Sequence, residues 1–331
     1  MRGFSRRRGR AAALALLAAP AIALAACGAT QPPSTGDAGP AVAVAPPADA
    51  PATADAGTVL TTPSSNSCDV VPTFDPAAFP ATPHIDNRYL PLLPGMQFVL
   101  TGVAVGDDGK PYPHRIETDV TNLTKTVDGV STVVVFDRDY ENSVLQESEI
   151  YFEAQDRDGT VWNMGEYPEV YENGANTGAP KAWIAGVMGA NPGIAMPAQL
   201  RTGTPTFSEG MAPSVRFHDC GTVVATAQRT CIAIRCYDGT AVVDEYAPLE
   251  AGDGHQEKFL APGFGTVRVA AAGGNDPEAL QMSSSTTLCG AALASIGGLA
   301  SQEDQRAASA QRSLWGGTRP AAATLQATCT R

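Results

Sequence analysis

Five Asp-Gly pairs divide the middle of this 331-residue chain into short segments rich in β-branched and aromatic residues. Asp-Gly favours tight hairpin turns, because both residues can adopt positive φ at little cost. The pairs are Asp108-Gly109, Asp128-Gly129, Asp158-Gly159, Asp238-Gly239 and Asp253-Gly254. The segments that we expect to be strands cover residues 96–105, 114–126, 130–140, 145–154, 160–165, 222–236, 241–246 and 265–270. No long amphipathic helix pattern interrupts them, which argues against βαβ units. We therefore predict a mainly β fold, an antiparallel meander that curves into a half-barrel or a sandwich.

Three acids alternate with mostly apolar residues along one of these predicted strands. Glu147, Glu149 and Glu153 fall on one face of the strand and the apolar residues on the other. Because one wet face and one packed face are typical of an antiparallel sheet, we expect the three acids to lie in solvent. The alternative is a calcium site that also uses Asp137, Asp139 and Glu141. Calcium would require six or more oxygens that converge on one point.

The N-terminus has the organisation of a bacterial export signal. Five arginines within the first ten residues precede an apolar run at 11–24, which is too short to span a membrane. The sequence Leu24-Ala25-Ala26-Cys27-Gly28 then resembles the lipobox of bacterial lipoproteins. We predict a signal peptide at 1–26 and lipid attachment at Cys27, with chains such as palmitate, since more than one chain gives stable anchoring. The alternative is an ordinary secreted protein in which Cys27 is incidental.

Composition divides the rest of the chain into three parts. Of the 40 residues 27–66, 30 are Ala, Pro, Gly, Ser or Thr, and none is Lys or Arg. Such a segment cannot offset its ordering entropy by burial, so we predict a lipidated cysteine followed by a disordered Ala/Pro-rich linker. Residues 67–296 form the predicted β-rich domain. Residues 297–331 read as a low-complexity tail with one possible short helix near 301–314.

The charge balance limits the partners of the protein. The formal net charge is −12, and the acids all follow Cys27, whereas five of the 22 basic residues precede it. This acidity counts against nucleic-acid binding and against docking on anionic lipid through a basic patch. The expected partners are a membrane, through the lipid anchor, and an unknown small molecule or envelope protein. The expected location is the bacterial cell envelope, after export.

Six cysteines remain after Cys27, an even number that favours disulfides in an exported protein. They are Cys68, Cys220, Cys231, Cys236, Cys289 and Cys329. We expect three disulfides, with two disulfides plus free thiols as the alternative. Cys231 and Cys236 are five residues apart in one predicted strand, so their side chains would point to opposite faces and would not pair. A metal site is disfavoured, because no C-x-x-C occurs and the histidines are scattered.

No familiar catalytic motif occurs in the chain. Neither a G-x-S-x-G elbow nor H-E-x-x-H is present. His218-Asp219-Cys220 places a base beside a thiol, but sequence neighbours on a strand point apart. The histidines are interpreted as surface or turn residues; they are His84, His114, His218 and His255. The segment 156–159 imitates the start of a calcium loop and is better explained as a hairpin turn. We interpret the large side chains Trp162, Met164 and Trp183 as packing residues. We therefore predict no catalytic, cofactor-binding or metal-ligating residue.

Several stretches resemble a functionally uncharacterised family of bacterial secreted β-rich proteins and lipoproteins. They are NRYLPLLPG at 87–95, TKTVDGV at 124–130, AQDRDGTVWNMGE at 154–166, AGVMGANPGIAMP at 185–197 and APGFGTV at 261–267. The resemblance implies a β-rich domain in the envelope and implies no catalytic residue. The extra cysteines and the longer C-terminal tail depart from the family, so no disulfide pairing is carried over.

Two functional hypotheses follow. The first is a membrane-anchored lipoprotein that acts as a non-catalytic binding or structural module, and it is the one we favour. The alternative is an extracytoplasmic hydrolase that uses two carboxylates, since such a pair needs only a suitable separation in space. The candidates for that pair are Asp137, Asp139, Glu147, Glu149, Glu153 and Glu166. Two buried acids that face each other in an open cleft would favour the hydrolase.

Overall fold

The structure is a computed structural model that describes residues 68–106, 109–274 and 277–329. The predicted signal peptide, Cys27 and the linker lie outside these residues. Within the described ranges, no helix is long and apolar enough to cross a membrane.

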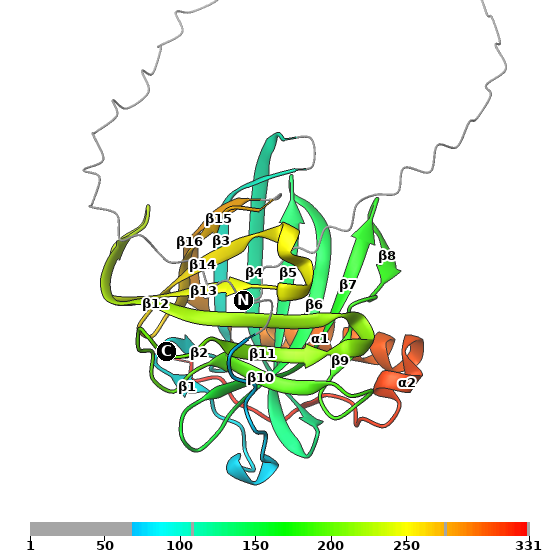
Figure 1. Cartoon of the computed structure of the whole chain (residues 1–331). Helices are drawn as coiled ribbons and strands as arrows, with labels where there is room; N and C mark the ends of the chain where they lie inside the picture. Colours follow the sequence, from blue (N-terminus) through cyan, green and yellow to red (C-terminus); the bar gives the residue numbers. More distant parts are fainter. Residues whose placement is uncertain (1–67, 107–108, 275–276, 330–331) are drawn as a thin grey trace, which may run out of the picture. The chain divides into compact units, whose positions relative to one another are not determined.

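The protein is mainly β and antiparallel, as predicted, but its sheet closes into a barrel. Twelve strands form the ring. They are β3 (Met96–Val105), β4 (Pro111–Val127), β5 (Val130–Glu141), β6 (Val144–Gln155), β7 (Val161–Glu172), β10 (Asn191–Met196), β11 (Phe207–Ala212), β12 (Phe217–Cys231), β13 (Cys236–Tyr246), β14 (His255–Ala261), β15 (Gly265–Ala272) and β16 (Glu278–Thr287). Figure 1 shows β10 to β12 in front of β4 to β7.

The short strand β10 closes the ring and corrects the predicted half-barrel or sandwich. One edge of β10 pairs with β11, through Pro192 and Gly210, and the other pairs with β7, through Gly193 and Asn163. A side chain at Gly193 would collide with the backbone of Gly210. Glycine therefore permits the close backbone approach at the closing seam. This seam joins strands that are not neighbours in the sequence, which is why the pattern of strands and turns did not reveal it.

Short elements connect the barrel strands and cover them. They are the 3-10 helices η1 (Pro76–Ala78), η2 (Pro213–Val215) and η3 (Pro248–Asp253), and the strands β1 (Asp86–Asn87), β2 (Leu90–Pro91), β8 (Ala175–Gly178), β9 (Trp183–Ile184) and β17 (Ala322–Ala323).

Two of the Asp-Gly pairs form the predicted turns between consecutive strands. Asp128-Gly129 connects β4 to β5, and Asp158-Gly159 connects β6 to β7. Asp238-Gly239, by contrast, lies inside β13, where the pairing register with β12 shifts. The positive φ of Gly239 thus accompanies an irregularity within the strand rather than a hairpin turn.

The C-terminal region is ordered, which corrects the predicted tail. Helix α1 (Ala291–Ala310) packs against the outer face of the barrel over β4 to β6, and the short helix α2 (Arg312–Trp315) lies against α1 and β9 (Figure 1). Ala300 and Ala307 of α1 are fully buried. Alanine is the strongest helix former, and a face of small side chains lets a helix approach a sheet closely. The Ala-rich composition therefore encodes a packed helix.

Two large apolar clusters lie on opposite sides of the barrel wall. One lies outside, where Trp315 of α2 contacts Phe152 and Tyr167. The other contains a residue from every strand of the ring, so it can only fill the interior. These residues are Phe98, Val120, Val133, Tyr151, Val161, Met196, Phe207, Val223, Val243, Leu260, Val267 and Met282. They identify the inward face of each strand and therefore decide which other side chains point inward.

The six cysteines form three disulfides, as the sequence predicted: Cys68–Cys220, Cys231–Cys236 and Cys289–Cys329. The prediction that Cys231 and Cys236 do not pair was wrong. The segment is not one strand, because β12 ends at Cys231, a turn follows, and β13 begins at Cys236. The turn is closed by the hydrogen bond from Ile232 N to Arg235 O. It contains neither Gly nor Pro, so it carried no turn signal.

Candidate functional site

The acids of β5 and β6 point into the barrel. Asp137 and Asp139 continue the inward face that Val133 starts, and they lie opposite Glu149 and Glu147, respectively. The sequence separated the two faces of β6 correctly. The expectation that its acids lie in solvent was wrong for Glu149 and Glu153, which are buried, whereas Glu147 is half-buried. In a closed barrel both faces are covered, one by the interior and one by α1.

Further carboxylates reach the same interior from other strands. Glu166 lies opposite the inward Tyr151. Glu209 is placed by its contact with the inward Gly221, because a Cβ built on Gly221 would lie 2.7 Å from Oε1 of Glu209. Three more share the inward side of their strands with Val223, Val243 and Met282. These are Asp219, Glu245 and Glu278, and all three are buried. Sequence reasoning missed Glu209 and these three acids, because only closure of the ring brings them to the others.

The polar residues occupy one end of the interior. Val133 of β5, Val223 of β12 and Val243 of β13 belong to the large inner cluster. Each of these strands also carries an inward acid, and all of these acids lie on the same side of the inner cluster, toward one end of the barrel. At this polar end, four buried apolar residues of β3, β4, β15 and β16 form a separate cluster: Leu100, Ile116, Val269 and Leu280. The polar end of the interior thus has an apolar wall on these four strands and an acidic wall on β5–β7 and β11–β13.

His114 lies inside the barrel and not at the surface, which corrects the sequence interpretation. Its Nε2 is 2.7 Å from Asp139 Oδ1, and its Nδ1 is 2.9 Å from Glu278 Oε2. Burial alone would lower the pKa of His114, but the hydrogen bonds to the two carboxylates outweigh burial and raise the pKa to about 10. The imidazole is therefore protonated at neutral pH and neutralises part of the charge of these acids. On β14, Lys258 forms an ion pair with Glu245.

Asp137 is the most informative of the inward acids. Its side chain is 7% exposed, and burial raises its pKa to about 6. Thr118 of β4 lies directly opposite it and is buried as well. A side-chain hydrogen bond from Thr118 acts against the effect of burial and lowers the pKa of Asp137, but burial is the larger effect.

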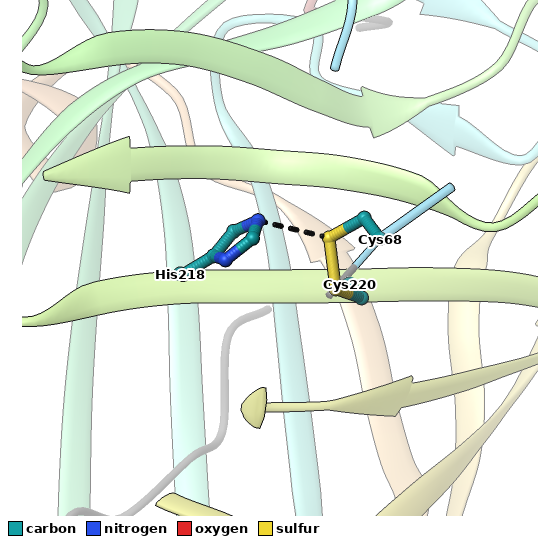
Figure 2. A group of neighbouring side chains, drawn as sticks. All are labelled: Cys68, His218 and Cys220. Atoms are coloured by element: carbon teal, nitrogen blue, oxygen red, sulfur yellow. Dashed lines mark hydrogen bonds between the residues drawn. A yellow bond between two sulfur atoms is a disulfide. The ribbon is translucent and has the colours of Figure 1, made fainter. Parts of the chain in front are cut away.

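Only one group of three possible metal ligands converges among the described residues. Cys68, His218 and Cys220 offer ligand atoms that all lie within 4.8 Å of one another. Figure 2 shows, however, that the two sulfurs are bonded to each other, with His218 Nε2 3.1 Å from Cys68 Sγ. Burial lowers the pKa of His218. The neutral imidazole therefore lies beside a disulfide, which supplies neither a nucleophilic thiolate nor a thiolate ligand.

The remaining residues that the sequence singled out have structural contacts. Asp156 caps its own turn, since it accepts hydrogen bonds from Asp158 N, Thr160 N and Trp162 Nε1. This supports the hairpin interpretation of that segment. Trp162, Met164 and Trp183 belong to the outer apolar cluster, in agreement with a packing role. The two other histidines lie beside acids, His84 near Asp86 at the surface and His255 against Asp244.

A scan against protein-family models finds no match, and a search of curated proteins finds none. Among solved structures, the chain is similar to a Bacteroides fragilis protein described as exported and as having a YmcC-like fold. The identity is 12%, the match covers 61% of this chain and 100% of that chain, and the TM-score is 0.35. It is also similar to a Parabacteroides distasonis protein described as a lipoprotein, with 11% identity, coverage of 60% and 99%, and a TM-score of 0.33.

Proposed function

We propose that this protein is a lipid-anchored binding module of the bacterial cell envelope and that its ligand site is the polar end of the barrel interior. The observation that carries the proposed site is the set of carboxylates on β5–β7 and β11–β13 that point into the barrel. Natural proteins rarely bury acids unless the acids are paired or serve a function. Two inner cations lie among these acids: His114 contacts Asp139 and Glu278, and Lys258 contacts Glu245.

The proposed location rests on the sequence. The basic segment, the apolar run and the lipobox-like sequence that ends at Cys27 are the features of a lipoprotein signal. The three disulfides support export, because disulfides persist in oxidising compartments. The linker between Cys27 and the barrel would hold the barrel away from the membrane.

The alternative hydrolase function keeps one supporting observation. Asp137 and Glu149 are directly opposite each other on neighbouring strands, and the raised pKa of Asp137 suits a general acid. Against this function, the inner acids are spread over seven strands, β5–β7, β11–β13 and β16, instead of forming one isolated pair. Binding is therefore the function that the geometry supports best.

Anchoring is tested by Cys27→Ala in the native host or in a bacterium that processes lipoproteins. The wild-type protein should enter the detergent phase in phase partitioning. The variant should accumulate as precursor or appear as a soluble secreted form. Mature-length variant in the detergent phase would contradict lipid attachment at Cys27.

The binding site is tested by native mass spectrometry of the protein purified from the envelope. The wild type should carry a bound molecule that is absent from the double variant Asp137→Asn/Glu149→Gln. The matched control is Asp86→Asn, an exposed acid outside the barrel, which should keep that molecule. A bound molecule retained equally by all three proteins would place the site elsewhere. A molecule released in cleaved form only by the wild type would support the hydrolase.

A further inference from the structure

We infer that Cys68, His218 and Cys220 bind a divalent metal ion of the zinc class when the disulfide between the two cysteines is reduced. The disulfide and the metal ion are thus alternative links between the same side chains. The site lies on the outer face of β12, so it is separate from the ligand site proposed inside the barrel. Three observations support it: the positions of the ligand atoms, the contacts that hold Cys68 in place, and the surroundings of the sulfurs.

The ligand atoms of the three residues converge on one face of β12. His218 and Cys220 are two residues apart on this strand, so their side chains project from the same face. Asp219, between them, points into the barrel, so this face is the outer one. Cys68 reaches the same place from the segment that precedes the barrel (Figure 2), and the three ligand atoms lie within 4.8 Å of one another. Two sulfurs on one tetrahedral zinc ion lie about 3.8 Å apart, since each Zn–S bond is about 2.3 Å long.

Backbone hydrogen bonds hold Cys68 beside β12 independently of the disulfide. Val70 N donates to Thr206 O at 3.0 Å, and Ser208 N donates to Val70 O at 2.9 Å. Ser208 is in turn directly opposite Cys220 in the pairing of β11 with β12. Reduction of the disulfide therefore leaves both sulfurs close together, and a metal ion would meet ligands that the fold has already positioned.

The surroundings of the sulfurs suit a thiolate site with one open position. Cys220 is fully buried, Cys68 is 7% exposed, and Tyr246 packs against both cysteines. His218 is half-buried, so solvent reaches the site from the side of the imidazole. Two sulfurs and an imidazole nitrogen favour zinc over calcium and magnesium, which prefer oxygen ligands. Three protein ligands leave the fourth position of a tetrahedral zinc ion to water.

Reduction of the disulfide requires a donor of two electrons, and the donor class is a dithiol that acts by thiol–disulfide exchange. The dithiol attacks the bond between Cys68 and Cys220 and becomes a disulfide itself. Its two electrons and two protons pass to the protein, where they convert the two cysteines to thiols. A divalent ion then binds both sulfurs as thiolates, and the two thiol protons pass to water. Reoxidation of the sulfurs reverses these steps and releases the metal ion.

The experiment compares the full mature chain, purified from the envelope in detergent, before and after reduction by a phosphine without oxygen. A phosphine reduces disulfides but supplies no thiolate ligand of its own. The probes are zinc chloride, in competition with a chromophoric chelator, and cobalt chloride, whose thiolate complexes have characteristic absorption bands. The reduced wild type should bind one equivalent of either ion and show the thiolate bands with cobalt. The oxidised wild type should show no such bands.

The decisive variant is His218→Gln, which keeps both cysteines and their disulfide. It should weaken zinc binding by more than about 100-fold, because loss of an outer-shell partner alone costs about 10–100-fold. The matched control is His84→Gln, at an exposed histidine, which should bind like the wild type. The double variant Cys231→Ser/Cys236→Ser removes a different disulfide and should also keep the site. In thermal melts of the reduced proteins, zinc should stabilise the wild type and both controls but not His218→Gln.

Several results would overturn the metal site. One is a reduced, folded wild type that binds neither probe. Another is zinc binding that His218→Gln leaves unchanged, because the imidazole would then not be a ligand. Thiolate bands that disappear in Cys231→Ser/Cys236→Ser and persist in His218→Gln would place the metal ion on other sulfurs. A reduced wild type that unfolds and that zinc does not restore would also count against the site. None of these results bears on the ligand of the barrel interior, which the double variant Asp137→Asn/Glu149→Gln tests separately.

Discussion

Replacing Asp137 by asparagine should make the ligand-free protein more stable at neutral and alkaline pH. Burial raises the pKa of Asp137 from 3.8 to about 6 in the folded protein. The folded state therefore binds the proton more tightly than the unfolded chain does. This group contributes most to stability below about pH 4, and that contribution is lost as the pH rises to about 6 and above. The difference between a pKa of 3.8 and a pKa of about 6 corresponds to roughly 3 kcal/mol of folding free energy.

The assay is urea unfolding of the wild type and of Asp137→Asn at about pH 4 and about pH 8, analysed by linear extrapolation. Asparagine does not titrate, so the variant should gain up to about 3 kcal/mol over the wild type at the higher pH. The two proteins should be nearly equal at the lower pH. The control Asp86→Asn, at an exposed acid, should match the wild type at both. A variant that is less stable than the wild type at pH 8 would refute the argument that the folded protein holds this charge at a net cost.

Three further predictions concern the helical segment on the outer face. Burial raises the pKa of Glu303 from 4.5 to about 8, so Glu303→Gln should match the wild type in urea unfolding at about pH 4 and should become the more stable protein as the pH rises toward 8; a variant less stable than the wild type at pH 8 would contradict a net cost of ionising this carboxyl. Trp315→Ala removes a fully buried side chain and should lower the free energy of unfolding by about 3–5 kcal/mol; a loss under about 1 kcal/mol, measured by urea unfolding, would mean that α2 is not packed on the barrel. The double variant Cys289→Ser/Cys329→Ser opens a bridge between residues 40 apart and should lower stability by about 2–4 kcal/mol; a wild type whose unfolding is insensitive to reductant would contradict this.

The strands could be predicted from the sequence where alternation and a turn signal coincided. The predicted segment 96–105 coincides with β3, and 130–140 differs from β5 by one residue. Both segments alternate, and an Asp-Gly pair lies next to each. The turn between Cys231 and Cys236 was missed because it has no Gly or Pro. Helix α1 was predicted only in part, because its alanines and glycines read as low complexity.

Closure of the barrel could not be predicted, because it depends on pairing between β7 and β10. No turn joins these two strands directly, and β8 and β9 intervene in the sequence. Because closure of the barrel was not predicted, the candidate site inside it was not predicted either. The alternation along β6 correctly placed Glu147, Glu149 and Glu153 on one face, but period two does not say whether that face is wet. In an open sheet, the acidic face of β6 would lie in solvent. In a ring the acidic face becomes part of the interior, where it meets acids from strands far away in the chain.

The interior as a whole should give this protein an unusual dependence of stability on pH. The pKa of His114 is raised from 6.5 to about 10 in the folded protein, so its contribution is full below about pH 6.5 and is lost as the pH rises through 10. Asp137 has the same sign at lower pH, because its contribution is lost between about pH 4 and 6. Acid denaturation of most proteins reflects carboxylates whose pKa falls on folding. These two inner groups act in the opposite direction, so the ligand-free barrel should lose stability as the pH rises from about 4 to 10. The measurement is a series of thermal melts across this pH range. A ligand-free protein whose melting temperature rises steadily from acid to alkaline pH would show that these inner groups do not dominate.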